Sequence, residues 1–331
     1  MELYWIWFQE LKKISSKEKL KIIEKYKDPK IIYNITNSNE YNLTEFKEIF
    51  FIISRQLSLE KSKIILHESN KLGIKIATYK RNNKMIAGNF VIYYKGELTN
   101  KKSIAIVGTR NISGSGYYYT EKICESLMNK EICINSGLAF GIDYEAHRYS
   151  YKHNNYTMAF LAHGLDMCYP KEHTAFMEKI AEKYAVVSPF PVGVKPFKYN
   201  FYKRNELLSL FSDEIIVVEA SLKSGSLITA NYAKNQGKKI WSIKGTDSLK
   251  CAGNNSLIKN NAEDYIVVNN IEKIDIKSNF IIKELTKSSL TTSDLAKKLK
   301  ITTIDIENEL INLELNRWIN KKANKWQYNG W

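Results

Sequence analysis

The sequence has few residues that could build a covalent or metal-held framework. Its 331 residues include only four cysteines and five histidines. Cys124, Cys133, Cys168 and Cys251 lie far apart, and no C-x-x-C pair occurs among them. This spacing suits reduced thiols in the cytoplasm better than a disulfide framework or a zinc site. We therefore expect neither a metal nor another cofactor.

The chain also lacks an apolar run long enough to cross a bilayer. Its start, MELYWIWFQELKK, is rich in aromatic residues. Charged residues follow after about eight apolar positions, and no basic segment precedes them as a signal peptide requires. We expect this stretch to form a buried helix of a soluble protein that does not insert into membranes.

Two common nucleotide-binding fingerprints are missing as well. A P-loop needs G-x-x-x-x-G-K-[ST], and this string occurs nowhere in the chain, which excludes ATP hydrolysis of that type. A dinucleotide site needs G-x-G-x-x-G after its first strand and an acidic residue after its second. Here the glycine spacing differs, and Asn135 and Ser136 stand where the acid belongs.

Acidic residues are outnumbered, since 50 Lys+Arg face 35 Asp+Glu and give a formal charge of +15. Such an excess favours a polyanionic partner, either a nucleic acid or an anionic membrane surface. A lysine-rich, evenly solvated surface would give the same count. The net charge therefore indicates a polyanionic partner only if the basic residues form a localised site.

From Ser103 onward, short apolar runs alternate with amphipathic stretches. The runs lack strict polar alternation, as expected of strands buried on both faces of a parallel sheet. The pattern predicts a doubly wound, mostly parallel α/β sheet, which IKIAT (74–78) and FVIYYKG (90–96) would extend. The expected strands lie within 104–107, 132–134, 158–161, 185–188, 214–219 and 239–243. The expected helices cover 116–129, 141–152, 172–183, 204–211 and 227–236.

The two ends of the chain show different patterns. Residues 1–60 carry apolar positions at helical spacing and predict a small helical domain. Within 276–331, three helical patterns precede two strand-like segments around KKAN, which is typical of a winged helix. Thr292 or Ser293 is expected to cap the second of these helices. The central α/β domain would then span 61–275.

Small and hydroxyl-bearing residues concentrate in the loops that follow the predicted strands. In a doubly wound sheet these loops meet helix N-termini at one edge, which accepts anions. The loops read GTRNISGSG (108–116), NSGLAFG (135–141), AHGLD (162–166), SPFPVGVKP (188–196), EASLKSGS (219–226) and KGTDS (244–248). The cations beside them are Arg110, Lys171, Lys195, Lys198, Lys203, Arg204, Lys223 and Lys244.

A row of anion-accepting loops fits a chain of phosphates better than it fits one nucleotide. Tyr199, Phe201 and Tyr202 lie among the lysines and offer faces on which unpaired bases can stack. Single-stranded DNA or RNA is therefore the leading ligand. The alternative is that the glycines serve only tight turns and the aromatic rings pack in the core.

Several of these segments, in the same order, resemble the motifs of the DNA-processing protein A family, also called Smf. The matching segments are Gly108-Thr109-Arg110, 136–147, 162–173, Phe201 with Arg204 and Asn205, and 219–230. The sequence departs from the family pattern at Ala162, His173, Pro189, Lys244 and Asn261. The resemblance covers roughly residues 100–265, and the flanking domains resemble those of the family more loosely.

The resemblance implies an extended Rossmann-like core between a helical, SAM-like domain and a winged-helix-like domain. It implies a homodimer that binds single-stranded DNA, protects incoming DNA and helps load the RecA recombinase during natural transformation, without catalysis. The loops and the resemblance together give the candidate nucleic-acid-binding residues. These are Gly108, Thr109, Arg110, Ser136, Gly137, Lys171, Phe201, Lys203, Arg204, Asn205, Ser224, Gly225, Ser226 and Lys244.

An enzyme is the main alternative. Asp143 and His147, four residues apart on a predicted helix, could form a catalytic or metal-binding dyad, or a hydrogen bond that ties the helix start to a loop. Cys168 and His173 would need a third group to orient the histidine, and none is identified. Hydrolysis of a nucleotide's glycosidic bond, with Glu219 as the acid, stays open.

A transcription regulator that uses the C-terminal module is a third possibility. A recognition helix in the major groove needs cations facing phosphates and bases. The segment TTIDIENELINLELN instead carries Asp305, Glu307, Glu309 and Glu314, and no Lys or Arg occurs before Arg317. Charge repulsion therefore argues against this docking.

Overall fold

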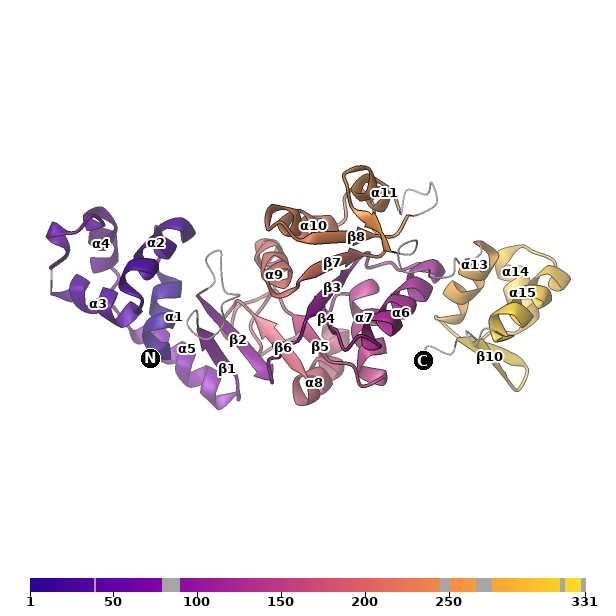
Figure 1. Ribbon diagram of the computed structural model, residues 1–331. Helices are drawn as coiled ribbons and strands as arrows, with labels where there is room; N and C mark the ends of the chain where they lie inside the picture. Colours follow the sequence, from indigo (N-terminus) through magenta and orange to yellow (C-terminus); the bar gives the residue numbers. More distant parts are fainter. Residues whose placement is uncertain (39, 79–89, 245–250, 266–275, 316–318, 329–331) are drawn as a thin grey trace. The chain divides into compact units, whose positions relative to one another are not determined.

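The computed structural model describes residues 1–38, 40–78, 90–244, 251–265, 276–315 and 319–328 (Figure 1). The chain divides into two compact units, one made of Met1–Thr99 and Met158–Phe211 and the other of Asn100–Thr157 and Ser212–Trp331. Each helix within the described ranges is too short or too polar to span a membrane. The domain boundaries expected after residues 60 and 275 stay a prediction.

Helices make up the first part of the first unit. In order they are α1 Glu2–Glu10, α2 Ser16–Tyr26, α3 Pro29–Asn37, η1 Glu40–Leu43, α4 Lys47–Ser54 and α5 Glu60–Lys71. The aromatic start of the chain forms α1, in which Trp5, Ile6 and Phe8 are fully buried, as expected. A capping box between Ser15 and Glu18 begins α2.

The strands of the first unit follow the order β1 Lys75–Thr78, β2 Val91–Gly96, β6 Ala185–Ser188 and β5 Thr157–Phe160. Strands β5 and β6 are parallel, whereas β2 pairs antiparallel with both β1 and β6. The segments 74–78 and 90–96 therefore extend the sheet as predicted. The remaining elements are η2 Lys171–His173, α8 Thr174–Lys183 and α9 Lys198–Phe211.

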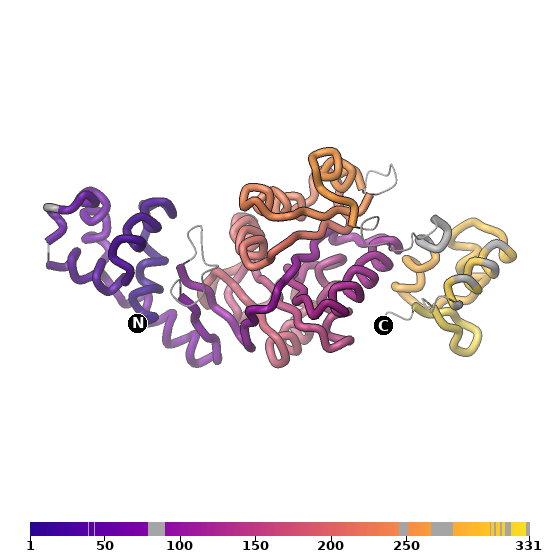
Figure 2. Tube along the Cα trace, in the orientation of Figure 1, coloured from indigo at the N-terminus to yellow at the C-terminus, as the bar shows by residue number. Residues whose placement is uncertain are grey.

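The second unit contains a parallel stretch of sheet in the order β4 Cys133–Ser136, β3 Ser103–Val107, β7 Glu214–Val217, β8 Lys239–Ser242 and β9 Glu263–Asp264. Each adjacent pair of strands in this order is parallel. The connecting helices are α6 Gly114–Met128, α7 Ile142–Lys152, α10 Ser226–Asn235 and α11 Ala252–Lys259 (Figure 2). The predicted mostly parallel α/β fold is confirmed.

The packing of this stretch explains its continuous apolar runs. Helices α6 and α7 pack together and on β3 and β4, while α10 packs on β7 and β8. All five residues of β3 are buried, because helices and neighbouring strands cover them. Ile104, Ile106 and Ile216 belong to one core cluster with residues of α6 and α7.

The helix boundaries differ from expectation in one instructive place. Helix α9 begins at Lys198, six positions before the predicted start at residue 204. Its first turns carry lysine and exposed aromatic residues, so apolar periodicity gave no signal there.

The C-terminal part of the second unit comprises α13 Ile276–Leu285, α14 Thr292–Leu299, α15 Thr303–Leu315 and an antiparallel hairpin of β10 Ile319–Lys322 and β11 Lys325–Tyr328. The cap of α14 is Thr291, not Thr292 or Ser293. The Thr291 hydroxyl accepts a hydrogen bond from the Asp294 amide at 3.1 Å, and the Asp294 carboxylate reaches back. The winged-helix assignment stays a prediction.

Candidate nucleic-acid interface

Nine of the predicted site residues lie at one edge of the second unit. Strands β3, β4, β7 and β8 run parallel, so the loops after them leave from the same edge. These loops carry Gly108, Thr109, Arg110, Ser136, Gly137, Ser224, Gly225, Ser226 and Lys244. Arg110 and Lys244 are exposed, as is the neighbouring Lys223.

Backbone hydrogen bonds fasten the first of these loops to its neighbours. The amide of Thr109 donates to the Glu219 carbonyl at 2.7 Å, and the Thr109 carbonyl accepts from the Ile142 amide at 3.1 Å. Gly108 is packed so closely that a Cβ there would lie 2.5 Å from Cγ1 of Ile142. The loop thus holds Arg110 at its exposed tip on a rigid base.

A carboxylate of the chain itself occupies the N-terminus of α6. The amide and the hydroxyl of Ser113 both donate to Glu219 Oε2, at 3.0 and 2.9 Å, and Glu219 is only 3% exposed. A Cβ on Gly116 would lie 2.6 Å from that same oxygen. A helix N-terminus attracts an anion, and here Glu219 is that anion. The start of α6 is thus filled by a carboxylate of the chain itself, while a role of the loop 108–116 in binding an external anion stays a prediction.

Removal of the Glu219 carboxylate should loosen the start of α6. We expect Glu219→Ala to lower the free energy of unfolding by about 1–3 kcal/mol, because the amide of Ser113 loses a charged acceptor inside the protein. Urea unfolding measures the change. The matched variant Glu131→Ala removes an exposed carboxylate and should alter stability by less than about 0.5 kcal/mol. Equal stability of both variants would contradict this role.

Ser136 and Gly137 form hydrogen bonds that stabilise the fold at the end of β4. The Ser136 hydroxyl donates to the Ile106 carbonyl at 2.6 Å, and the Gly137 amide donates to the Asp143 carboxylate at 3.2 Å. Asp143 thereby ties the start of α7 to the preceding loop, one of the two alternatives considered for it. Nδ1 of His147 lies 2.7 Å from the Thr157 hydroxyl. Among the described residues, no group of three potential metal ligands occurs.

The loop before α10 presents hydroxyl groups beside exposed cations. The hydroxyls of Ser224 and Ser226 lie 2.7 Å apart, and Gly225 between them is exposed. Ser226 itself is largely buried at the start of the helix. The part of this loop that faces solvent therefore runs from Ser221 to Gly225 and includes Lys223.

The other predicted residues belong to the first unit. Lys171 is exposed at the start of η2. Arg204 and Asn205 are 6% and 8% exposed, and Nη1 of Arg204 donates to the Phe160 carbonyl at 3.4 Å. The Arg204 guanidinium lies 5.7 Å from the centroid of the Phe201 ring, which also makes a T-shaped contact with the Tyr169 ring. The buried Arg204 side chain thus links α9 to the end of β5.

Helix α9 and the loop before it present a different aromatic surface. Tyr199 is 66% exposed, and the ammonium group of Lys203 lies 5.5 Å from its ring centroid. Phe197 is 64% exposed and was missed in the sequence analysis. The alternation of lysine and aromatic residues in KPFKY, from Lys195 to Tyr199, is the signal that could have identified it.

The environment of Cys168 argues against a nucleophile. Burial raises the pKa of the Cys168 thiol to about 11, and its Sγ donates to the Pro170 carbonyl at 3.3 Å. Burial also lowers the pKa of His163, whose Nε2 accepts from the Tyr169 amide at 3.1 Å. A protonated thiol at neutral pH is a weak nucleophile.

The match with known proteins follows the α/β part of the chain. The family model described as DNA recombination-mediator protein A matches residues 74–275. The chain belongs to this family. Protein Smf of Synechocystis is 37% identical over 188 residues, which cover 55% of this chain and 47% of that protein. The chain spans about half the length of the first curated relatives it matches.

Two solved structures of recombination-mediator relatives share the fold. DNA processing protein A from Streptococcus pneumoniae aligns with a TM-score of 0.67 at 23% identity, covering 83% of this chain and 99% of that one. DNA processing protein A from Helicobacter pylori, described by its single-stranded DNA binding mode, aligns with a TM-score of 0.54 at 23% identity. That alignment covers 64% of this chain and 96% of that one.

Proposed function

We propose that this protein binds single-stranded DNA, protects it and helps load the RecA recombinase during natural transformation. The main support is that Arg110, Lys223 and Lys244 are exposed at one edge of the second unit. At the same edge, the Glu219 carboxylate already occupies the N-terminus of α6. The phosphate of a cofactor cannot bind at the start of α6, because the Glu219 carboxylate occupies that position. Exposed cations on firm loops suit a long polyanion that passes over the surface.

The relatives support the same conclusion. Their family is described as a recombination mediator, and the Helicobacter pylori protein is described by its binding of single-stranded DNA. Action in the cytoplasm, homodimer formation and delivery of RecA are parts of this proposal. RecA delivery is tested by following RecA filament formation on a strand coated with single-strand-binding protein, with and without this protein.

Substitution of Arg110 tests the proposed strand contact. We expect Arg110→Ala to weaken binding of a labelled single strand about tenfold, or about 1.4 kcal/mol, because a guanidinium that contacts phosphate is lost. Fluorescence anisotropy at several salt concentrations measures the affinity, and the slope of its salt dependence should fall by about one.

The control for this experiment is Arg55→Ala. Arg55 has the same charge, lies in the first unit just after α4, and stacks over the Phe51 ring at 4.5 Å. Its loss should leave strand affinity within about twofold, since Arg55 is not one of the candidate strand-binding residues and an exposed charge without a direct phosphate contact is screened by salt. If the two variants bind equally, Arg110 is not part of the interface.

We further propose that the protein is not an enzyme. Glu219, the acid required for glycosidic-bond hydrolysis, is buried and bound to Ser113. Its environment suits a structural anion, since a catalytic acid must reach the substrate oxygen. Incubation with nucleoside monophosphates, followed by chromatography for released base, tests this point. Base release that disappears in Glu219→Ala would establish the hydrolase instead.

A further inference from the structure

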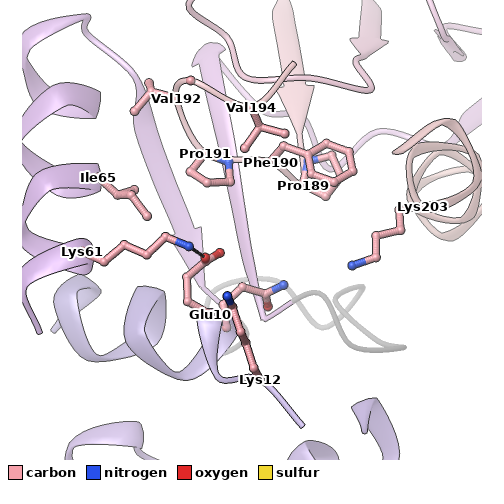
Figure 3. A pocket seen from close by; sticks show the side chains of 12 residues that line it. Glu10, Lys12, Lys61, Ile65, Pro189, Phe190, Pro191, Val192, Val194 and Lys203 are labelled. Carbon is pink, nitrogen blue, oxygen red and sulfur yellow. Dashed lines mark hydrogen bonds and ion pairs between the residues drawn. The ribbon is translucent and has the colours of Figure 1, made fainter. Parts of the chain in front are cut away.

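A cavity of about 450 Å³ lies within the first unit and shares only Lys203 with the candidate strand-binding residues. It lies where the loop after β6 meets the end of α1, the start of α5 and one face of α9 (Figure 3). Its volume falls in the range of pockets that enclose small ligands, roughly 300–1,000 Å³.

Three of the residues that line this cavity are lysines. Lys12, Lys61 and Lys203 line it together with a single carboxylate, that of Glu10. Lys61 forms an ion pair with Glu10, as Figure 3 shows, so the positive charges of Lys12 and Lys203 exceed the acidic charge present. Three lysines from three separate parts of the chain therefore line one cavity.

A fourth lysine, Lys19, contacts a residue of the cavity lining without lining the cavity itself. Lys19 is 7% exposed, and its ammonium donates to the carbonyl of Gln9, a lining residue, at 2.8 Å. Burial lowers the pKa of Lys19 to about 8; Glu10 raises it and Lys203 lowers it further. The buried cation is therefore poorly compensated by the protein, and a bound anion would stabilise it.

Another part of the cavity lining is apolar. It is formed by Ile65 and by the segment from Pro189 to Val194, which begins at the carboxyl end of β6. Ligands of open α/β sheets bind outside the carboxyl ends of strands. A proline- and phenylalanine-lined wall suits a flat ring, while the lysines suit the anion attached to it.

We propose that this cavity binds one phosphorylated nucleotide, with its phosphate among Lys12, Lys61 and Lys203 and its base against the wall of Pro189, Phe190 and Pro191. Two sources supply this chemistry, a free nucleotide and the 5′-phosphorylated end of a DNA strand. An acidic peptide would satisfy the lysines but would leave the apolar wall without a flat partner. Apart from Lys203, the lining residues are not among the candidate strand-binding residues, so this site goes beyond the proposed function.

Calorimetric titration of the full chain with deoxyadenosine 5′-monophosphate tests the site. The nucleotide should bind at least about tenfold more tightly than deoxyadenosine, because a charged hydrogen-bonding group is lost with the phosphate. Lys12→Gln should weaken nucleotide binding about tenfold, and Lys12→Arg should retain it. The matched control Lys17→Gln removes an exposed lysine of α2 outside the cavity and should bind as the wild type does.

Oligonucleotides with 5′-phosphate and 5′-hydroxyl ends identify the source. If the strand end is the ligand, the 5′-phosphate tightens binding to the wild type, and this gain disappears in Lys12→Gln. If a free nucleotide is the ligand, both strands bind alike while the mononucleotide still binds. The 5′-hydroxyl strand should bind Lys12→Gln and the wild type equally, which separates this site from the strand-binding edge.

Three results would overturn the proposal. Deoxyadenosine could bind as tightly as its monophosphate, or Lys12→Gln could bind the nucleotide with wild-type affinity. A tetraglutamate peptide could also displace the nucleotide at equal concentration, which would make the cavity a general patch for acidic ligands.

Discussion

Replacing Arg148 with alanine is expected to lower the free energy of unfolding by about 3–5 kcal/mol. Nη2 of Arg148 lies 2.8 Å from Glu121 and 2.5 Å from Glu145, and its Nε donates to Glu145 at 2.9 Å. The three side chains are 17%, 10% and 3% exposed. Without the guanidinium, two carboxylates would face each other inside the protein with no cation between them.

The pH should modulate this loss. Burial, reinforced by the charge of Glu145, raises the pKa of Glu121 to about 7. Because this pKa is higher in the folded state, the stability associated with protonated Glu121 is complete below about pH 4.5 and is lost as the pH rises through 7. Arg148 lowers that pKa, so its removal should cost more at pH 8 than at pH 5.5. Urea unfolding at the two values measures the difference.

Lys122→Ala provides the matched control. Lys122 lies on the same helix as Glu121, and its ammonium is 3.1 Å from Glu125, but both side chains of this pair are more than a third exposed. Water screens such a pair, so its loss should change stability by less than about 1 kcal/mol at either pH. A similar loss in the two variants, or a loss in Arg148→Ala that is independent of pH, would contradict the buried-cluster account.

The second large effect is expected for Gly141→Ala. Gly141 has φ +78°, and a Cβ there would lie 2.2 Å from the Thr109 carbonyl oxygen and 2.8 Å from the Arg110 carbonyl carbon. The backbone of the first loop must move to accept the methyl group, and Arg110 moves with it. We expect stability to fall by about 3 kcal/mol and strand affinity to fall about tenfold or more.

Gly73→Ala separates backbone strain from collision. Gly73 also has a positive φ, +64°, but a Cβ there would meet no atom within 4 Å. Its substitution should cost only about 1 kcal/mol of stability and leave strand binding unchanged. Urea unfolding and anisotropy titration measure both variants. If Gly141→Ala binds the strand as tightly as Gly73→Ala, the position of the loop does not control the interface.

Local sequence patterns predicted most of the α/β elements. The apolar runs at 104–107, 185–188 and 239–243 became β3, β6 and β8 because strands covered on both faces need apolar side chains throughout. The third of the helical patterns predicted within 276–331 forms α15, Thr303–Leu315. The same patterns failed at the start of α9, where aromatic and charged residues hide the helical period.

The sequence identified the motif residues, but it did not show which residues they contact in the folded protein. Arg110 and Arg204 look equivalent as cations beside loops, yet Arg110 is exposed and Arg204 is buried against the Phe160 carbonyl. Exposure depends on which elements cover a residue, and that depends on packing between distant parts of the chain. Local spacing carries no such information.

By itself the sequence determined the alternation of strands and helices, the glycine- and hydroxyl-rich loops and the excess of basic residues. Only the tertiary structure decided that Glu219 fills the start of α6, 106 residues from its partner Ser113, and that Lys12, Lys61 and Lys203 surround one cavity. Periodicity arises from neighbours along the chain, so the sequence displays it directly. Occupancy of an anion site and convergence of charges arise from contacts across the fold, which exist only once the chain has packed.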